Sequence, residues 1–139
     1  MNTSRPLDRD ATPAPAAGLL RTRPRRLTCR LTTLHPERAL SRALVQHLSG
    51  ELSDIEFTLE DRPEVDVVWM CGYERGNANA IRQLRARHPM TLLLVTGKEP
   101  AEIWSHEVHE AGADSALAWP VELGRLSRAL HRPRARRRA

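Results

Sequence analysis

Apolar residues gather in two short uninterrupted runs, and these runs predict the centre of a parallel β-sheet. Residues 65–71 read Val-Asp-Val-Val-Trp-Met-Cys, and residues 92–96 read Leu-Leu-Leu-Val-Thr. A strand that is buried on both faces has such a continuous run, whereas a strand with one solvated face alternates between apolar and polar residues. The polar, helix-length stretch between the two runs indicates a βαβ unit.

Other segments extend this pattern to five strands with connecting helices. Further strands are predicted at residues 27–32, 55–59 and 115–118, helices at 36–49, 78–87, 100–111 and 121–130, and a loop at 72–77. Leu40, Leu44 and Leu48 recur every four residues and predict the buried stripe of the first helix, which opens at Pro36. The alternation over residues 55–60 is typical of a half-exposed edge strand. The order of elements predicts an α/β fold, a three-layer, doubly wound, five-stranded parallel sheet.

The basic charge of the chain is confined to its two ends. The formal net charge is +5, and counting charged side chains gives +4 for residues 1–26, −4 for residues 27–131 and +5 for residues 132–139. Residues 1–26 are rich in Pro, Ala and Arg, which predicts a disordered leader, followed by one folded domain and an Arg-rich tail. Because the predicted domain is mildly acidic, any nucleic-acid binding must rest on the tails.

Several function classes find no support in the sequence. No apolar stretch is long enough for a signal-peptide core or a membrane helix, so we expect a cytoplasmic protein without membrane contact. Cys29 and Cys71 fall inside predicted strands, where we expect buried thiols in a reducing compartment. The turn after the first strand has no glycine, which argues against a nucleotide or flavin site. We therefore expect no cofactor.

A pair of histidines on one predicted helix has a spacing that a metal site can use. The pair is His106 and His109, with Glu102 and Glu110 nearby. The same residues lie opposite the apolar stripe of the helix that includes Trp104, where polar side chains are simply solvated. We therefore expect no metal at this position.

Four features of the second half of the chain occur together. An apolar strand follows Asp66, another ends at Leu94-Val95-Thr96-Gly97, the sequence Ala111-Gly112-Ala113-Asp114 follows a helix, and Trp119-Pro120 precedes the last helix. In this order and spacing, residues 27–131 resemble the receiver domain of bacterial response regulators. The resemblance implies a flavodoxin-like sheet with strand order 2-1-3-4-5 and a pocket at the carboxyl ends of the strands.

The resemblance also implies that the phosphorylation chemistry of the family is missing. Receivers accept a phosphoryl group on an aspartate at the end of the third strand, where this chain has Cys71. The acidic pair that binds Mg²⁺ falls on Thr33 and Leu34, and the lysine that precedes the proline falls on Trp119. Only the hydroxyl at the end of the fourth strand is retained, as Thr96. Phosphoryl transfer depends on positioning and charge neutralisation, so these losses imply a phosphorylation-independent pseudo-receiver.

The second helix of a receiver is expected to be short or absent. Only residues 60–64 separate the second and third predicted strands, whereas a parallel crossover normally takes a dozen residues or more. Either the helix has become an extended link, or the strand at 55–59 pairs differently from the family. The pseudo-receivers of ANTAR-type amidase antiterminators are similar in shape, with a Pro after the first strand. No RNA-binding helices are predicted here, so the resemblance implies protein binding and not antitermination.

The primary hypothesis is a non-enzymatic module of two-component signalling that regulates signalling or transcription by binding another protein. The partner would be a signalling or regulatory protein, or a second copy of the chain. The expected surface comprises the fourth helix, fifth strand and fifth helix, with His106, His109, Asp114, Trp119 and Arg125 as candidate contacts. Trp119 is expected to be partly exposed, and an aromatic side chain in that position can anchor an interface.

Two other function classes stay open. A nucleic-acid-associated regulator would bind through the arginines near the C-terminus. These are Arg132, Arg134, Arg136, Arg137 and Arg138. Their phosphate contacts would be salt-sensitive and without base readout, and an acidic protein would suit them equally well. An enzyme would use Cys71 as a nucleophile, although no His or Lys is visibly placed to lower its pKa.

Overall fold

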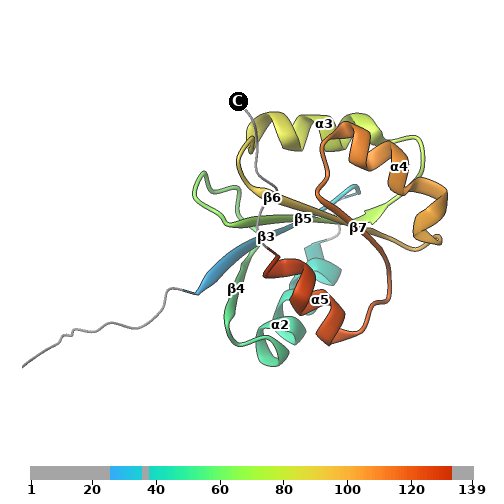
Figure 1. Ribbon diagram of the computed structural model, residues 1–139. Helices are drawn as coiled ribbons and strands as arrows, with labels where there is room; N and C mark the ends of the chain where they lie inside the picture. The colour runs from blue at the N-terminus through green and yellow to red at the C-terminus, as the bar shows by residue number, and fades with distance from the viewer. Residues whose placement is uncertain (1–25, 36–37, 133–139) are drawn as a thin grey trace, which may run out of the picture.

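The apolar runs of the sequence form the inner strands of a parallel sheet that lies between two layers of helices. The computed structural model describes residues 26–35 and 38–132 (Figure 1). The strands are β3 (Leu27–Thr33), β4 (Ile55–Thr58), β5 (Val67–Tyr73), β6 (Leu92–Gly97) and β7 (Ser115–Ala118). The helices are α2 (Arg38–Glu51), α3 (Ala78–Arg87), α4 (Ala101–Ala111) and α5 (Leu123–Leu130). The sheet order is β4-β3-β5-β6-β7, which confirms the predicted doubly wound fold.

Three predicted features lie outside the described residues. They are the leader up to residue 25, the helix start at Pro36 and the tail beyond residue 132. Within the described part, no helix is long and apolar enough to cross a lipid bilayer.

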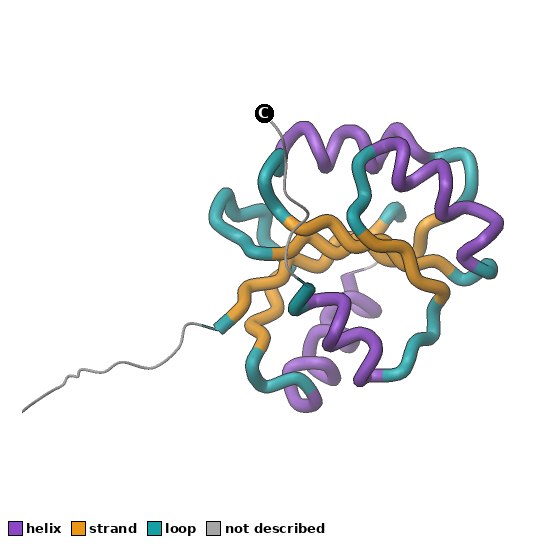
Figure 2. The backbone as a smooth tube through the Cα atoms, viewed as in Figure 1, coloured by secondary structure: helices purple, strands orange, loops and turns teal. Residues whose placement is uncertain are grey.

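Two hydrophobic cores flank the sheet. Helices α2 and α5 cover one face, and α3 and α4 cover the other (Figures 1 and 2). Along β5, Val67 and Trp69 belong to the α2/α5 core, whereas Val68 and Met70 belong to the α3/α4 core. All four side chains are buried. This double burial explains the continuous apolar run of β5, because neither of its faces meets water.

An extended link replaces the second helix of a receiver. Residues 59–66, between β4 and β5, contain no helix, and β4 still pairs in parallel with β3. The structure therefore decides between the two alternatives that the sequence left open. In the link, Asp61 accepts a hydrogen bond from Arg30 Nη1 at 3.1 Å and lies 3.3 Å from Arg87 Nη2. These polar contacts tie the link to β3 and to the end of α3.

Strand β5 continues past Cys71, so the prediction of a loop from residue 72 is wrong for its first two residues. Gly72 has a φ of 75°, and the pairing of β5 with β6 shifts register between Met70 and Tyr73. A bulge of this kind reverses the alternation of side chains. Tyr73 consequently enters the α3/α4 core, where its ring centroid lies 5.4 Å from that of Trp104. Residue alternation cannot reveal such a bulge in advance.

The buried stripe predicted for the first helix is wrong at one position. Leu48 is buried and Leu44 is half-buried, but Leu40 is 66% exposed. Leu40 lies in the first turn of α2, where the helix borders a cavity at the carboxyl ends of the strands. Helical periodicity identifies the inner side of a helix and does not show where the sheet beneath it ends.

A buried ion pair joins α3 to β6 and β7. Asp114 Oδ2 lies 2.8 Å from Arg85 Nη2 and accepts a hydrogen bond from the Leu93 N–H at 2.8 Å. The Arg85 guanidinium also donates to the Gly112 and Thr91 carbonyl oxygens. Gly112 has a φ of 123°, and a Cβ there would lie 2.8 Å from the Arg85 side chain. The sequence 111–114 therefore closes α4 and anchors Arg85 beneath the closing turn.

We expect Asp114→Ala to lower the free energy of unfolding by roughly 3 kcal/mol, because it leaves the largely buried Arg85 cation without this carboxylate. Urea denaturation monitored by circular dichroism measures the change. Glu110→Ala is the matched control, since it removes an exposed carboxylate near the end of α4 and should change stability by less than about 0.5 kcal/mol. Equal stabilities for the two variants would contradict the structural role of Asp114.

Candidate functional site

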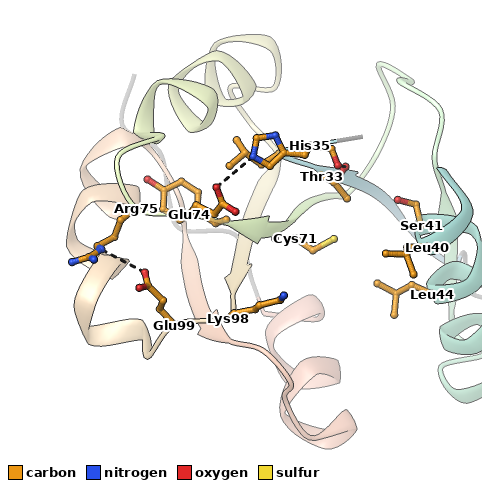
Figure 3. A pocket seen from close by; sticks show the side chains of 13 residues that line it. Thr33, His35, Leu40, Ser41, Leu44, Cys71, Glu74, Arg75, Lys98 and Glu99 are labelled. Carbon is orange, nitrogen blue, oxygen red and sulfur yellow. Dashed lines mark hydrogen bonds and ion pairs between the residues drawn. The ribbon is translucent and has the colours of Figure 1, made fainter. Parts of the chain in front are cut away.

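A cavity of about 750 Å³ lies at the carboxyl ends of β3, β5 and β6 (Figure 3). In a doubly wound sheet this edge is the usual place for a ligand, because the loops there diverge. The cavity is lined by three of the positions that the receiver resemblance singled out, namely Thr33, Leu34 and Cys71. Thr96 and Trp119, the other two positions, are not among its lining residues.

The Cys71 thiol is half-buried in this cavity and is a free thiol, like that of the fully buried Cys29. Burial raises the pKa of Cys71 to about 11, and burial likewise raises the pKa of Cys29. A cysteine nucleophile needs the opposite shift, because the thiolate is the reactive form. Cys71 is therefore a neutral thiol at physiological pH.

The Thr96 side chain faces away from the cavity, because its hydroxyl accepts a hydrogen bond inside the core. Trp69 Nε1 donates a hydrogen bond to Thr96 Oγ1 at 2.9 Å, and both residues have no exposed surface. The Trp119 ring lies next to Trp69, with centroids 5.6 Å apart, and is half-buried. The Thr96 hydroxyl is thus a structural acceptor, and Trp119, the residue that the resemblance places at the lysine position, packs its ring on the core.

The cavity has no set of carboxylates arranged for a metal ion. Thr33 Oγ1 donates to the His35 carbonyl oxygen at 3.0 Å, and Leu34 has no ligand atom in its side chain. Two carboxylates on the rim have nitrogen atoms of other side chains beside them: Glu74 Oε1 lies 3.4 Å from His35 Nε2. Glu99 lies 3.4 Å from Arg75 Nε. Across the part of the chain that the structure describes, no group of three or more His, Cys, Asp or Glu residues could hold a metal.

Sequence reasoning missed Lys98, which lines the cavity from the end of β6. It is the only lysine of the chain and is exposed. Figure 3 shows its side chain on one side of Cys71 and Leu40 and Leu44 on the other. The signal that could have found Lys98 is its place directly after the predicted strand 92–96, since the carboxyl ends of parallel strands meet at one edge.

Tyr73 was also missed, and it connects the cavity wall to α4. Its hydroxyl donates to Glu107 Oε2, which also accepts the Gly76 N–H at 2.8 Å. The hydrogen bond from Tyr73 and that from the Gly76 N–H hold the pKa of Glu107 below its usual range. Burial, together with this carboxylate, raises the pKa of Tyr73. The pair therefore stays as phenol and carboxylate at neutral pH and fixes the loop after β5 on α4.

Three of the five residues suggested for partner binding are exposed. His106 and His109 lie on α4, and Arg125 lies on α5. His106 pairs with Glu110 at 3.3 Å, and His109 Nδ1 lies 3.0 Å from the Ala113 carbonyl oxygen. The contacts of both histidines therefore lie within α4 and the turn that follows it.

The other two suggested residues are less accessible. Trp119 is partly exposed, as expected. The inclusion of Asp114 is wrong: its side chain is only 5% exposed, because Arg85 and the Leu93 N–H hold it inside. A carboxylate engaged in this way is not available to a partner.

The structure describes only the first of the tail arginines. Arg132 donates to Ser115 Oγ at 2.7 Å and to the Asp114 carbonyl oxygen at 3.2 Å, so its guanidinium lies against the start of β7. Arg134, Arg136, Arg137 and Arg138 lie outside the described residues.

Comparison with known proteins relates the chain to response regulators by fold. The sequence matches no protein-family model and no curated protein. A response regulator receiver protein from Pseudomonas putida is 16% identical, with a TM-score of 0.57 over 78% of this chain and 98% of that one. A Burkholderia pseudomallei response regulator, solved with a phosphorylated aspartic acid and a calcium ion, is 14% identical, with a TM-score of 0.56 over 77% and 67% of the two chains.

A further similar structure is ascribed to a pilus assembly protein. This protein, from Burkholderia thailandensis, is 17% identical, with a TM-score of 0.54 over 74% of this chain and 97% of that one. Likenesses at such identities establish the receiver-type fold. What the chain does has to be argued from its own residues.

We expect alkylation of native Cys71 by iodoacetamide to keep accelerating up to about pH 10, because only the thiolate reacts and burial disfavours it. Intact mass spectrometry counts the added groups, and Cys29 should stay unmodified because it has no exposed surface. The Cys71→Ser variant is the control and should take up no reagent while folded. A rate that levels off below about pH 8 would contradict the raised pKa and would favour a reactive nucleophile.

Proposed function

We propose that this chain is a non-enzymatic, cytoplasmic signalling module that has the receiver fold, works without phosphorylation and acts by binding another regulatory protein. The observation that carries this proposal is the composition of the cavity. Its acceptor position holds the neutral thiol of Cys71, and its two metal positions hold Thr33 and Leu34. An acyl phosphate with bound Mg²⁺ requires carboxylate oxygens at these positions.

The surroundings of the acceptor position support the same proposal. Phosphoryl transfer also needs a cation and a hydroxyl directed at the transferred group. The Thr96 hydroxyl is engaged with Trp69, and the aromatic ring of Trp119 stands at the lysine position. Lys98 supplies a cation next to the end of β6, but the acceptor position on β5 holds Cys71 and offers no carboxylate with which the cation could pair. The cavity thus keeps the shape of a receiver pocket without its reactive groups.

Exposed side chains on α4 and α5 support the choice of a protein partner. Ile103 on α4 is 45% exposed and Leu123 on α5 is 37% exposed, although both are large and apolar. Exposed polar residues follow each of them on the same helix, namely His106 and Arg125. Apolar side chains with a polar or Arg-containing rim are typical of protein interfaces. The same surfaces would serve a homodimer.

Nucleic-acid binding through the Arg-rich tail is the alternative. It is supported by five arginines among the last eight residues, whereas residues 27–131 carry a net charge of −4. Such binding would be electrostatic and sensitive to salt.

We expect neither the wild-type chain nor Cys71→Asp to become phosphorylated by acetyl phosphate with Mg²⁺. The variant restores an acceptor carboxylate, but Thr33, Leu34 and Trp119 still provide neither metal ligands nor the cation that neutralises the phosphoryl group. Intact mass spectrometry and beryllofluoride-induced NMR shifts measure the outcome. A receiver that carries the acceptor aspartate serves as the positive control, and a phosphorylated form of either chain would overturn phosphorylation independence.

We expect Arg125→Glu to weaken capture of a stoichiometric protein partner from source-cell lysate by about tenfold, because it reverses a charge on the proposed α5 surface. Arg42→Glu is the matched control, since Arg42 is equally exposed but lies on α2. Quantitative mass spectrometry after nuclease treatment measures the capture.

The same capture separates the two candidate functions. A partner that survives nuclease treatment and removal of residues 132–139 supports the protein-binding module. Recovery of nucleic acid alone, and only with the tail present, would instead support the alternative. Equal loss of a protein partner in Arg42→Glu and Arg125→Glu would rule out the α5 surface.

A further inference from the structure

Lys98 is the one Lys or Arg side chain, among the described residues that line the cavity, without an ion pair to a described residue. On its rim, Glu74 pairs with His35 and Glu99 pairs with Arg75, each at 3.4 Å. Lys98 forms no ion pair with any residue of the described part, and Cys71 contributes a neutral thiol. An ammonium without a partner carboxylate offers a contact to a negative charge on a ligand, whereas the Glu74 and Glu99 carboxylates on the rim disfavour a second negative charge.

The wall opposite Lys98 is apolar. Leu40 is 66% exposed and Leu44 is half-buried, and both border the cavity from α2 (Figure 3). Because Leu40 contributes nothing to the core, its apolar surface is available to a ligand, and burying it against an apolar group is favourable. Thr33 and Ser41 add hydroxyl groups to the lining.

We propose that this cavity binds a small organic monocarboxylate whose carboxylate meets Lys98 and whose compact apolar body packs against Leu40 and Leu44. The volume of about 750 Å³ is ample for a body of six to eight carbons or one aromatic ring. A phosphate dianion suits the site less well, because Glu74 and Glu99 on the rim repel the second charge. This inference goes beyond the proposed protein binding and needs no partner to be present.

The test titrates the full chain with hexanoate and phenylacetate, with hexanamide as a neutral isostere and phenyl phosphate as a dianion. Two readouts are recorded: amide NMR shifts, and protection of Cys71 from iodoacetamide with the fully buried Cys29 as internal reference. We expect saturable shifts confined to residues around the cavity, protection of Cys71, and binding of hexanoate at least about fivefold tighter than of hexanamide. Phenyl phosphate should bind more weakly than phenylacetate.

Two variants separate the charged and the apolar contribution. Lys98→Gln should weaken hexanoate binding about five- to tenfold and remove the preference over hexanamide, because only the ammonium distinguishes the two. Leu40→Ala should weaken hexanoate about fourfold and leave that preference intact. Both side chains are exposed, so both variants should fold normally. Arg128→Gln is the matched control, since it removes an exposed cation at the far end of α5 and should change nothing.

Several results would overturn the site. They are non-saturable shifts, equal affinity for hexanoate and hexanamide, unprotected Cys71 at saturation, or an effect of Lys98→Gln no larger than that of Arg128→Gln. None of these results depends on whether a protein partner is found, so the site and the proposed function can fail separately.

Discussion

The indole N–H of Trp69 needs a hydrogen-bond partner inside the sheet, because a buried donor without one costs about 1 to 3 kcal/mol. The partner is the Thr96 hydroxyl, 2.9 Å away on the neighbouring strand. Phe57 and Trp119 pack around the same indole, with ring centroids 6.4 and 5.6 Å from it. This cluster joins β4, β5, β6 and the turn after β7 on the side of the sheet that α2 and α5 cover.

The same hydrogen bond engages the hydroxyl that the receiver resemblance singled out. Thr96 is at the end of the fourth strand in the sheet, where the family uses a hydroxyl, but here the hydroxyl is buried and satisfied by Trp69. Trp119, which the resemblance places at the lysine position, packs its apolar ring against the α2/α5 core.

Where a receiver has its second helix, charged side chains hold the link between β4 and β5 on the sheet. On the α3/α4 side, β3 presents Arg30 where a helix would otherwise supply apolar cover, and its side chain is only 12% exposed. Asp61 of the extended link meets Arg30 and Arg87, so the link stays on the sheet through ion pairs. His88 lies beside this cluster, and burial lowers its pKa, so it stays neutral and adds no repulsion at physiological pH. A short polar link can thus close an edge that a helix normally covers.

The sequence by itself determined the three layers and the inner strands, because continuous apolar runs depend on local pattern, whereas the strand order followed from the resemblance to receivers. The resemblance to receivers also singled out Thr33, Leu34 and Cys71, which line the cavity. The tertiary structure alone decided what depends on distant partners. The bulge at Gly72 places the Tyr73 side chain in the core, and the ion pair with Arg85 keeps the Asp114 side chain buried.

The cavity itself shows the same division most clearly. Lys98 and Leu40 are 58 positions apart in the sequence, and neither belongs to a recognisable motif. They border one space because β6 ends, and α2 begins, at the same edge of the sheet. Periodicity assigned Leu40 to the core, since a one-dimensional pattern contains no information on where the sheet stops. The contacts of Glu74 with His35 and of Glu99 with Arg75 on the rim likewise exist only because the fold brings these side chains together.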